Sequence, residues 1–397
     1  MFIDLPMPEK LSDKWLTDDF ASRFFTLQTG GVKVAFYYDY PDASTFRYRV
    51  YNFIEVIEKA QSPDIQPEIS ASWFCYADGA HLDRVVEAAD ILVLSRARYS
   101  ARLNDLVTRA KSLNKQVLFD VDDLVIDPQF THLIVHTLDQ NIYGEDVWDY
   151  WFGYIGRVAA AMGMCDRVIT TNEFLADRLS GSTGKHISVV PNFINTEQLR
   201  YSDRIFQHKL ENRFARDAKI DIGYFSGSPS HNKDFRIASG SLAKLMREQE
   251  AIRLVLVGYL DLQGPISEFS DRILKLPMQD YIGLQRIIGS AELNIVPLQD
   301  NTFTNCKSEL KYFEAAVVGT PTLASPTWAF SNSIRDGENG WLVRGHEWYD
   351  KIGSAIDILN KKPSDFFEIA ALAREQARLN FSWESQYLSV KTALLGP

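Results

Sequence analysis

The chain alternates short apolar runs rich in Val, Ile and Phe with longer segments of helical, amphipathic periodicity. The runs are apolar nearly throughout, as in strands of a parallel sheet that helices cover on both faces. In the first half we expect strands at 32–38, 72–76, 91–95, 116–119, 167–170 and 187–190, and helices at 47–60, 99–112 and 147–162. This alternation predicts βαβ units and therefore an α/β fold with a parallel sheet.

The pattern is interrupted once and then restarts. Residues 195–219 carry many charges and no strand pattern, and we interpret them as an interdomain connection. Beyond them we expect strands at 221–225, 254–257, 293–297 and 322–324, and helices at 233–248, 279–289, 307–318, 347–359, 365–380 and near 383–394. A length of 397 residues suits two domains.

We therefore predict two doubly wound, Rossmann-like domains that face each other across a cleft. The N-terminal domain is expected over residues 1–200, with residues 1–30 as an arm packed on it, and the C-terminal domain over 217–380. The final segment, 381–397, is expected to be a helix that returns to the N-terminal domain.

Charge and composition argue against several classes of function. The formal net charge of −10 disfavours nucleic acid as a partner, because phosphates are bound by clustered Lys and Arg. No apolar run approaches the roughly 20 residues that a membrane-spanning helix needs, and the acidic first residues do not resemble a signal peptide. The three cysteines have no paired spacing, which fits a reducing cytoplasm and argues against a zinc site.

The segment 305–325, NCKSELKYFEAAVVGTPTLAS, is the most informative one. It follows a predicted strand and a polar loop, and we expect its helix to begin at about Lys307. The amides at a helix N-terminus suit a diphosphate, and Lys307 and Ser308 would add a cation and a hydroxyl. Lys311 and Glu314 lie on the same helix face, where a carboxylate can accept two ribose hydroxyls. The alternative is a surface helix with an ordinary Lys–Glu ladder.

A second segment, 222–234 or IGYFSGSPSHNKD, is a predicted strand that leads through a small polar loop into a helix. Phosphate-binding loops occupy this position in α/β folds. Gly227 would allow close approach of the backbone, with Ser228 beside it, and His231 and Lys233 supply hydrogen-bond donors. The segment matches neither the P-loop nor the G-x-G-x-x-G pattern, so a turn with a solvated lysine and a capping serine is the alternative.

Together these two segments resemble retaining glycosyltransferase family 4, which has the GT-B fold. Further matching motifs are VLVG at 255–258, NIVPL at 294–298, GTP at 319–321, IRDGENGWLV at 334–343, FSWESQY at 381–387, and CDRVITTNEFLADRL at 165–179 with ISVVPNFIN at 187–195. The resemblance covers residues 32–395. Glu314 matches the second of the family's two glutamates, but Cys306 replaces the first, and Ser228 stands where an arginine is frequent. The resulting K-S-x-x-K-x-x-E pattern is similar to bacterial transferases that build surface polysaccharides such as O-antigen.

The resemblance implies transfer of a hexosyl or deoxyhexosyl group from a nucleoside diphosphate sugar to a hydroxyl, with retention at the anomeric carbon. The acceptor would be a growing glycan or a lipid-linked saccharide. No metal and no cofactor other than the sugar donor as co-substrate would take part. The diphosphate would meet the amides near Ser308, Glu309 and Leu310, with Lys233 and Lys311 neutralising its charge. Two alternatives are a nucleotide-sugar epimerase of the same fold and a two-domain protein that binds a ligand without chemistry.

The N-terminal half is expected to supply the acceptor side. The segment 115–127, KQVLFDVDDLVID, places Asp120, Asp122 and Asp123 at or just beyond the end of a strand. Asp122 aligns best with the family's histidine that reaches the reacting sugar. A carboxylate there could orient the acceptor or stabilise positive charge at the anomeric carbon, with Asp120 and Asp123 as fallback candidates. Solvation or helix capping is the simpler alternative, and a metal site is a third.

Two basic segments complete the predictions. Arg47 and Arg49, in the segment that follows the first strand, are candidates to bind a phosphate or an anionic sugar of the acceptor, or else are exposed helix residues. The stretch Arg96–Lys115 holds six cations and one acid. We interpret it as a solvated helix face, and peripheral contact with anionic lipid of the inner membrane is the alternative.

Overall fold

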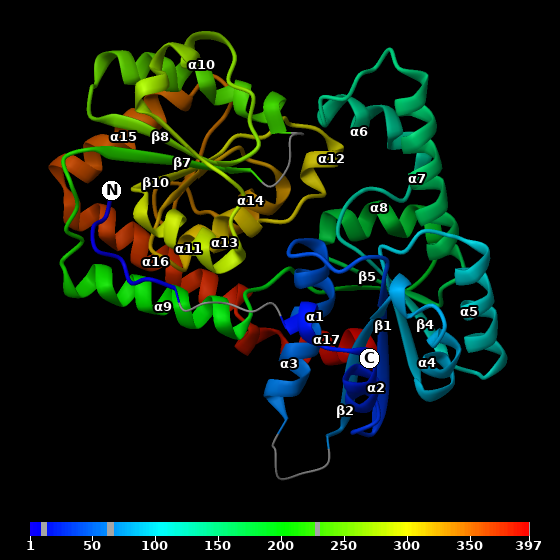
Figure 1. Ribbon diagram of the computed structural model, residues 1–397. Coiled ribbons are helices and arrows are strands. Elements are labelled where there is room, and N and C mark those ends of the chain that lie inside the picture. The colour runs from blue at the N-terminus through cyan, green and yellow to red at the C-terminus, as the bar shows by residue number, and fades with distance from the viewer. Residues whose placement is uncertain (9–13, 62–66, 227–230, 397) are drawn as a thin grey trace.

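The computed structural model describes residues 1–8, 14–61, 67–226 and 231–396, and contains two parallel six-stranded sheets (Figure 1). The first has the strand order β2-β1-β3-β4-β5-β6 and the second β12-β11-β10-β7-β8-β9. The strands are β1 Val32–Tyr38, β2 Ile69–Cys75, β3 Ile91–Ser95, β4 Gln116–Val121, β5 Arg167–Thr170, β6 Ile187–Val189, β7 Ile220–Ser226, β8 Ile252–Gly258, β9 Ile273–Leu276, β10 Leu293–Val296, β11 Thr322–Ala324 and β12 Trp341–Leu342. The predicted fold class, two facing Rossmann-like α/β sheets, is confirmed.

Helices connect the strands and cover both faces of each sheet (Figure 1). In the N-terminal half they are α1 Lys14–Thr17, α2 Phe20–Leu27, a π-helix at Arg47–Tyr51, α3 Asn52–Ala60, α4 Leu82–Ala88, α5 Ala101–Ser112, α6 Thr131–Thr137, α7 Glu145–Gly163 and α8 Glu173–Thr183, followed by α9 Thr196–Glu211. In the C-terminal half they are α10 Asn232–Glu248, α11 Tyr281–Ser290, α12 Thr302–Asn305, α13 Leu310–Ala316, α14 Trp328–Ser333, α15 Trp348–Lys361, α16 Pro363–Phe381 and α17 Trp383–Leu395. Short 3₁₀ turns lie at Tyr76–Asp78, Pro128–Phe130 and Gly264–Arg272.

The connection between the two sheets is a helix, α9. Asn195 caps it, since its side chain accepts a hydrogen bond from the Gln198 amide at 2.9 Å. Leu199, Ile205 and Phe206 are buried along one face, which shows that the charged residues of this segment are the outer face of an amphipathic helix. Sequence analysis also missed the strands β9 and β12, because β9 is partly exposed and β12 is two residues long.

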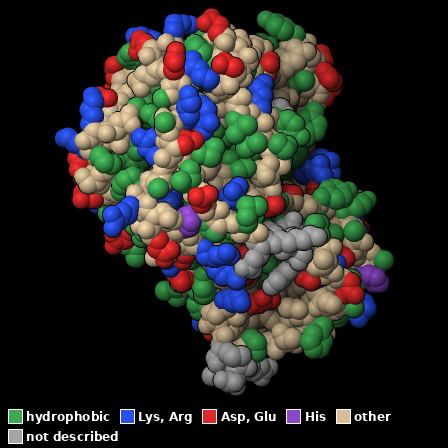
Figure 2. All heavy atoms as spheres, turned by 60° about the vertical axis from the view of Figure 1, so that its left-hand side comes forward, with side chains coloured by type: hydrophobic (Ala, Val, Ile, Leu, Met, Phe, Trp, Pro, Cys, Tyr) green, Lys and Arg blue, Asp and Glu red, His purple; other side chains and the backbone are tan. Residues whose placement is uncertain are grey.

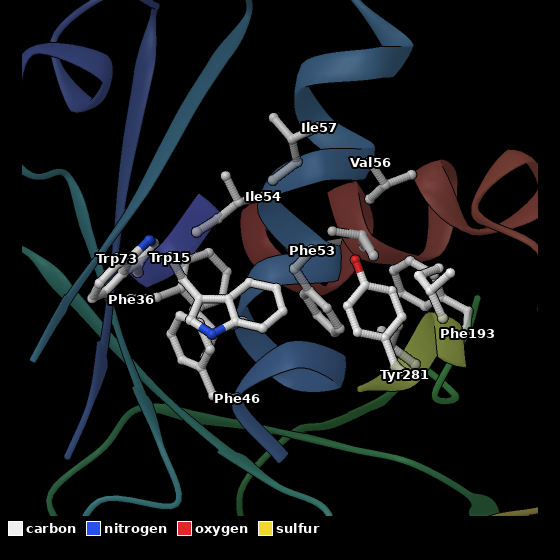
Figure 3. Close-up of a cluster of buried hydrophobic side chains, with 14 of the residues drawn as sticks. Trp15, Phe36, Phe46, Phe53, Ile54, Val56, Ile57, Trp73, Phe193 and Tyr281 are labelled. Carbon is white, nitrogen blue, oxygen red and sulfur yellow. The ribbon is translucent and has the colours of Figure 1, made fainter. Parts of the chain in front are cut away.

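Figure 3 shows a buried apolar cluster that residues of both halves form together. Phe53 of α3 and Phe193 come from the N-terminal half, and Tyr281 of α11 comes from the C-terminal half. Trp15 contacts both halves, with its ring centroid 4.8 Å from that of Tyr51 and 6.2 Å from that of Tyr281, on which it stacks. Since separating the halves would expose these rings to water, the cluster holds the two sheets together.

Both ends of the chain cross between the halves. The Phe2 amide donates to the Ser290 carbonyl at 2.9 Å, so the first residues lie against the C-terminal half and not where the predicted arm would place them. Further along the predicted arm, α2 packs on the first sheet, against β2 and β1, and Trp15 of α1 contacts Phe46 and Tyr51. At the other end α17 lies against α3, and the Ile194 amide donates to the Phe381 carbonyl at 2.8 Å.

Charged side chains of both signs are interspersed over the face of the molecule in Figure 2. None of the helices within the described ranges is both long and apolar enough to cross a membrane.

Candidate functional site

A cavity of about 620 Å³ lies between the two sheets, where strands of both end. The ends of β1, β3 and β4 contribute to one side, and those of β7 and β8 to the other. The N-terminal wall consists of Ala43, Ser44, Thr45, Arg47, Tyr48, Arg96, Asp122, Asp123, Val125, Ile134, Leu138, Trp151 and Asn192. The C-terminal wall consists of Phe225, Ser226, His231, Val257, Met278, Gln279, Tyr281, Leu284, Ile288, Phe303, Lys307, Leu310, Lys311 and Glu314. Ligands of open parallel sheets bind in this position.

The helix that carries the main motif begins later than the sequence suggested. Asn301 caps a short helix, α12, which ends at Asn305. The helical conformation is then interrupted until α13 begins at Leu310. Lys307 therefore lies in the break and not in the first helical turn. The amides near Leu310 still lie at the start of a helix, as expected.

Lys307, Lys311 and Glu314 all line the cavity, Lys311 and Glu314 from one face of α13 and Lys307 from the break that precedes it. The Lys307 ammonium lies 4.4 Å from the centre of the Phe303 ring and 3.7 Å from Asp123 Oδ1 on the opposite wall. Burial lowers the pKa of Lys311 to about 8, and its ammonium lies 5.2 Å from the centre of the Tyr224 ring. Two lysines on one wall provide the positive charge that a diphosphate needs.

His231 lines the cavity beside these lysines and is held by Asp234. Its Nδ1 donates a hydrogen bond to Asp234 Oδ2 at 3.0 Å, and Asp234 also accepts from the Gln299 amide at 3.1 Å. Burial and the charge of Lys311 lower the pKa of His231 to about 4. The imidazole is therefore neutral at pH 7, and its Nε2 is an acceptor and not a cation.

Glu314 is buried and connects the two walls. Its Oε1 accepts hydrogen bonds from the Tyr48 hydroxyl and, at 3.4 Å, from Gln198, and it lies 3.6 Å from the Arg47 guanidinium. Burial raises the pKa of Tyr48 far above its usual range, so Tyr48 remains a proton donor. Since these contacts all end on Oε1, the second oxygen is the one with which Glu314 can accept a ribose hydroxyl.

Of the other predicted donor-binding residues, Leu310 lines the cavity, whereas Lys233, Ser308 and Glu309 do not. Gly227 and Ser228 fall outside the described residues. The Lys233 ammonium donates to the His136 carbonyl at 2.6 Å and lies 3.5 Å from Asp139, so it joins the α6–α7 region to the C-terminal half. Ser308 accepts a hydrogen bond from Asn192 at 3.0 Å. Glu309 is buried, which raises its pKa to about 7.

Asp122, the preferred catalytic candidate, lines the N-terminal wall together with Asp123. The Arg96 guanidinium donates to Asp122 Oδ1 at 3.1 Å, and the Thr45 hydroxyl donates to Oδ2 at 3.2 Å. Arg96 follows β3 directly and has a φ of 49°, in a region that non-glycine residues seldom occupy. It was assigned to a solvated helix face, whereas it faces the cavity.

Asp120 and Arg49 lie beneath the cavity and do not line it. Both are buried, with Arg49 Nη2 2.6 Å from Asp120 Oδ1, and Arg49 also donates to the Val190 carbonyl at 2.8 Å. This corrects two expectations. Arg49 is neither exposed nor placed to meet an acceptor, because its charge is matched inside the protein, and the same pairing turns Asp120 away from the cavity.

Arg47 does reach the cavity, from the π-helix Arg47–Tyr51. It donates to the Gln198 side chain at 2.9 Å and lies 4.0 Å from the centre of the Tyr48 ring. π-Helical turns occur often at functional sites, and this one aims Arg47 and Tyr48 at the cleft while Arg49 points below it. The sequence analysis named Arg47 as a candidate site residue. It predicted neither the π-helical turn nor a role for the adjacent Tyr48.

The rest of the basic stretch is mostly surface. Arg102, Arg109 and Lys111 pair with the exposed carboxylates of Asp83, Glu87 and Asp166.

Among the described residues no group of His, Cys, Asp or Glu is arranged to hold a metal ion. Asp120 separates from Asp122 and Asp123 because it turns toward Arg49.

Three comparisons relate this geometry to known proteins. The family "Glycosyl transferases group 1" matches residues 220–360. The D-inositol 3-phosphate glycosyltransferase of Nocardia farcinica is 37% identical over 203 residues, which cover 45% of this chain and 41% of the relative. The corresponding protein of Rhodococcus erythropolis is 35% identical over 109 residues, 28% of this chain and 23% of the relative. The chain thus spans less than half the length of these curated relatives.

Solved structures resemble the whole chain. HepE (Alr3699) of Anabaena in complex with UDP and glucose superposes with a TM-score of 0.59 and 14% identity, over 91% of this chain and 98% of that one. The lipopolysaccharide glycosyltransferase WaaG gives a TM-score of 0.57 and 12% identity, over 92% and 100%. Residues 220–360 thus match the glycosyl transferases group 1, and the chain as a whole has the GT-B fold of two facing Rossmann-like domains.

Proposed function

We propose that the protein is a retaining glycosyltransferase that moves a sugar from a nucleoside diphosphate sugar to a hydroxyl of a glycan or lipid-linked saccharide, without a metal. One observation carries this proposal. Lys307, Lys311 and Glu314 line one wall of a cleft within the segment that matches group 1 glycosyl transferases. Two cations and a carboxylate on one face fit a diphosphate and a ribose.

The chemistry that these residues provide is mainly charge stabilisation. Lys307 and Lys311 would neutralise the departing diphosphate, and the low dielectric of the cleft strengthens that effect. Neutral His231 would accept a hydrogen bond from a donor hydroxyl. Asp122, on the opposite wall, would face the reacting sugar and stabilise positive charge at the anomeric carbon. The second oxygen of Glu314 would orient the nucleotide through its ribose.

The structural relatives suggest which donors to test first, since HepE was solved with UDP and UDP-glucose. The curated relatives are named for D-inositol 3-phosphate, so an anionic acceptor is an alternative to a glycan. Arg47 and Arg96 line the N-terminal wall, but Asp122, Asp123 and Glu314 neutralise them. This balance favours an uncharged acceptor.

A donor screen tests the proposal. The protein is incubated with UDP-, GDP-, ADP- and dTDP-sugars, with and without saccharide acceptors, and release of nucleoside diphosphate is measured. The expected result is release of nucleoside diphosphate from one class of donor. An acceptor should accelerate this release, EDTA should not inhibit it, and NMR of the product should show that the anomeric configuration is retained. Conversion of the donor to an epimer without release would indicate an epimerase, and binding without either reaction would indicate a ligand-binding protein.

A further inference from the structure

Aromatic side chains extend outward from the N-terminal wall of the cavity, along the edge of the first sheet that the carboxyl ends of its strands form. Trp151 lines the cavity, and on the same helix Tyr154 and Tyr150 lie beside it, with ring centroids 5.9 Å and 5.5 Å from that of Trp151. Tyr150 stacks on Tyr154 at 6.2 Å and 19°, and its side chain is 60% exposed. Ring faces that a helix presents to water at the mouth of a cleft need an explanation, because soluble proteins seldom expose contiguous aromatic surface.

A second aromatic pair lies further along the same edge. Tyr40 follows β1 and Tyr76 follows β2, their rings are 5.8 Å apart, and they are 61% and 64% exposed. In the sheet β2 lies next to β1 and β1 next to β3, so these rings extend the edge away from Asp122 at the end of β4. Parallel strands place all of these positions on one side of the sheet.

Arg98 and Asp39 connect the two aromatic groups. Arg98 Nε donates to Asp39 Oδ2 at 2.8 Å, and Asp39 precedes Tyr40 and accepts the Tyr76 amide through its carbonyl at 3.2 Å. The hydrogen bond to Asp39, together with the nearby hydroxyls of Tyr154 and Tyr150, raises the pKa of Arg98. A hydrogen-bond donor, Arg98, and an acceptor, Asp39, thus lie between the two groups of aromatic rings.

The arrangement is held in place. The Tyr99 amide donates to the Arg157 carbonyl at 2.9 Å, and Arg157 Nε donates back to the Tyr99 carbonyl at 2.8 Å. Arg96 donates to the Tyr154 hydroxyl at 3.0 Å. These bonds fix α7 over the end of β3, so a ligand would meet rings that are already oriented.

We infer that this rim, defined as Trp151, Tyr154, Tyr150, Arg98, Tyr40 and Tyr76, is a binding track for the distal sugars of an extended, uncharged saccharide acceptor. The inference rests on the proposed function and specifies its acceptor. A sugar ring has an apolar C–H face and a girdle of hydroxyls. The ring faces of tyrosine and tryptophan would pack against the C–H face of the sugar, and Arg98 and Asp39 would form hydrogen bonds with its hydroxyls.

A membrane surface is the other surface that would contact exposed aromatic rings. The same helix carries Glu145, Asp146 and Asp149, all exposed, and these would be repelled by anionic lipid. The exposed members of the track are tyrosines, whose hydroxyls favour a hydrated ligand over an acyl chain. A single anionic acceptor such as an inositol phosphate would be small enough to bind within the cavity and would leave the track unused.

The test measures binding of mono- to hexasaccharides from an array of neutral linear glycans to the full chain, without donor. Affinity for the preferred series should rise with length. Tyr150→Ala and Tyr76→Ala should each lower affinity for the longest member by about three- to tenfold and leave the monosaccharide unchanged. Tyr349→Ala, a tyrosine of α15 in the other half, is the matched control and should change neither.

The inference is overturned if no neutral glycan binds, if affinity does not depend on length, or if the tyrosine variants bind all lengths normally. The inference is also overturned if the tyrosine variants bind saccharides normally but no longer cosediment with phosphatidylglycerol vesicles. Nucleoside diphosphate binding, measured by calorimetry on the same samples, reports on the proposed function separately. If no nucleotide binds, the proposed function fails, whereas length-dependent glycan binding through the tyrosines would still stand.

Discussion

The two walls of the cleft hold their charged side chains in different ways. On the C-terminal wall, Lys307, Lys311 and Glu314 come from one short stretch of chain and reach the cavity together. On the N-terminal side, the charged groups come from the ends of β3 and β4 and from the π-helix, and they pair with one another. Arg96 holds Asp122, while Arg49 holds Asp120 below the surface.

The difference separates binding from positioning. Cations gathered along one wall are available to a ligand with several negative charges. Carboxylates that already have arginine partners contribute fixed dipoles and orientation, which matter more in a transition state than in ground-state binding. We therefore expect substitutions on the C-terminal wall to change donor affinity, and those on the N-terminal side to change stability or turnover.

The largest expected effect tests whether the Arg49–Asp120 pair is structural. Asp120→Ala would leave a buried, uncompensated guanidinium and should lower the free energy of unfolding by about 3–5 kcal/mol. Differential scanning calorimetry and urea denaturation measure the loss. Asp123→Ala, at a partly exposed carboxylate, is the control and should cost less than about 1 kcal/mol. A stable Asp120→Ala variant that lacks transferase activity would instead return Asp120 to the catalytic site.

Asp122→Asn tests catalysis on the N-terminal wall. The amide keeps the shape of the side chain and removes its charge, so turnover should fall by roughly 100-fold or more while donor affinity stays nearly constant. Steady-state kinetics and calorimetry with the donor separate the two quantities. Because Arg96 would lose a charged partner, the melting temperature is monitored as well. Near-normal transfer by Asp122→Asn would contradict the assignment.

The sequence predicted the strands of both sheets well where they are fully buried, because such strands form continuous apolar runs. It missed β9, which is partly exposed, and α9, whose charged face hid its apolar one. Lys311 and Glu314 were found because helical spacing is local, and Lys307 was found because it lies close to them in the sequence, although the helix begins only at Leu310. Arg96 could have been found by the reasoning that selected Asp122, since it follows β3 directly.

What sequence reasoning could not find depends on contacts between distant segments. Nothing local distinguishes Arg47, which reaches the cavity, from Arg49, which is buried with Asp120 seventy-one positions away. The contact of Tyr48 with Glu314 crosses between the halves, and the placement of Lys233 depends on the α6–α7 region. Each requires the tertiary arrangement to be known.

Glu314→Ala tests the nucleotide side of the comparison. Loss of a hydrogen bond from a ribose hydroxyl to a carboxylate should weaken nucleoside diphosphate binding by about 1.5–3 kcal/mol. Calorimetry measures this loss of affinity, and an unchanged affinity would exclude Glu314 as the residue that binds the ribose. Tyr48→Phe removes one of the contacts of Glu314 with the opposite wall and leaves its Oε2 in place, so it should change affinity much less. An equal loss in both variants would mean that Glu314 acts by joining the two halves.

The pH dependence of donor binding tests Lys311. Burial holds its pKa near 8 in the free protein, so the charge is present below that pH and is lost above it. A bound diphosphate favours the charged form. Affinity for a nucleotide sugar, whose phosphates do not titrate here, should be level between about pH 6 and 7.5 and then fall, approaching tenfold per pH unit. Lys311→Arg stays charged and should remove the decline. A decline that persists in this variant would belong to another group.

The smallest expected effect distinguishes Lys233 from Lys307. Sequence reasoning assigned both to the diphosphate, but Lys233 donates to the His136 carbonyl and lies near Asp139, outside the cavity lining, whereas Lys307 lines the cavity. Lys307→Ala should lower affinity for nucleoside diphosphate by about tenfold or more and barely affect the bare nucleoside. Lys233→Ala removes a partly exposed ion pair and should change either affinity by less than about threefold. The same calorimetric titrations with both ligands measure the two variants side by side. If Lys233→Ala weakens the diphosphate selectively and as strongly as Lys307→Ala, then Lys233 leaves His136 when the donor binds. The C-terminal wall would then gather its cations only in the bound state, and the contrast between a preformed binding wall and a positioning wall would no longer hold.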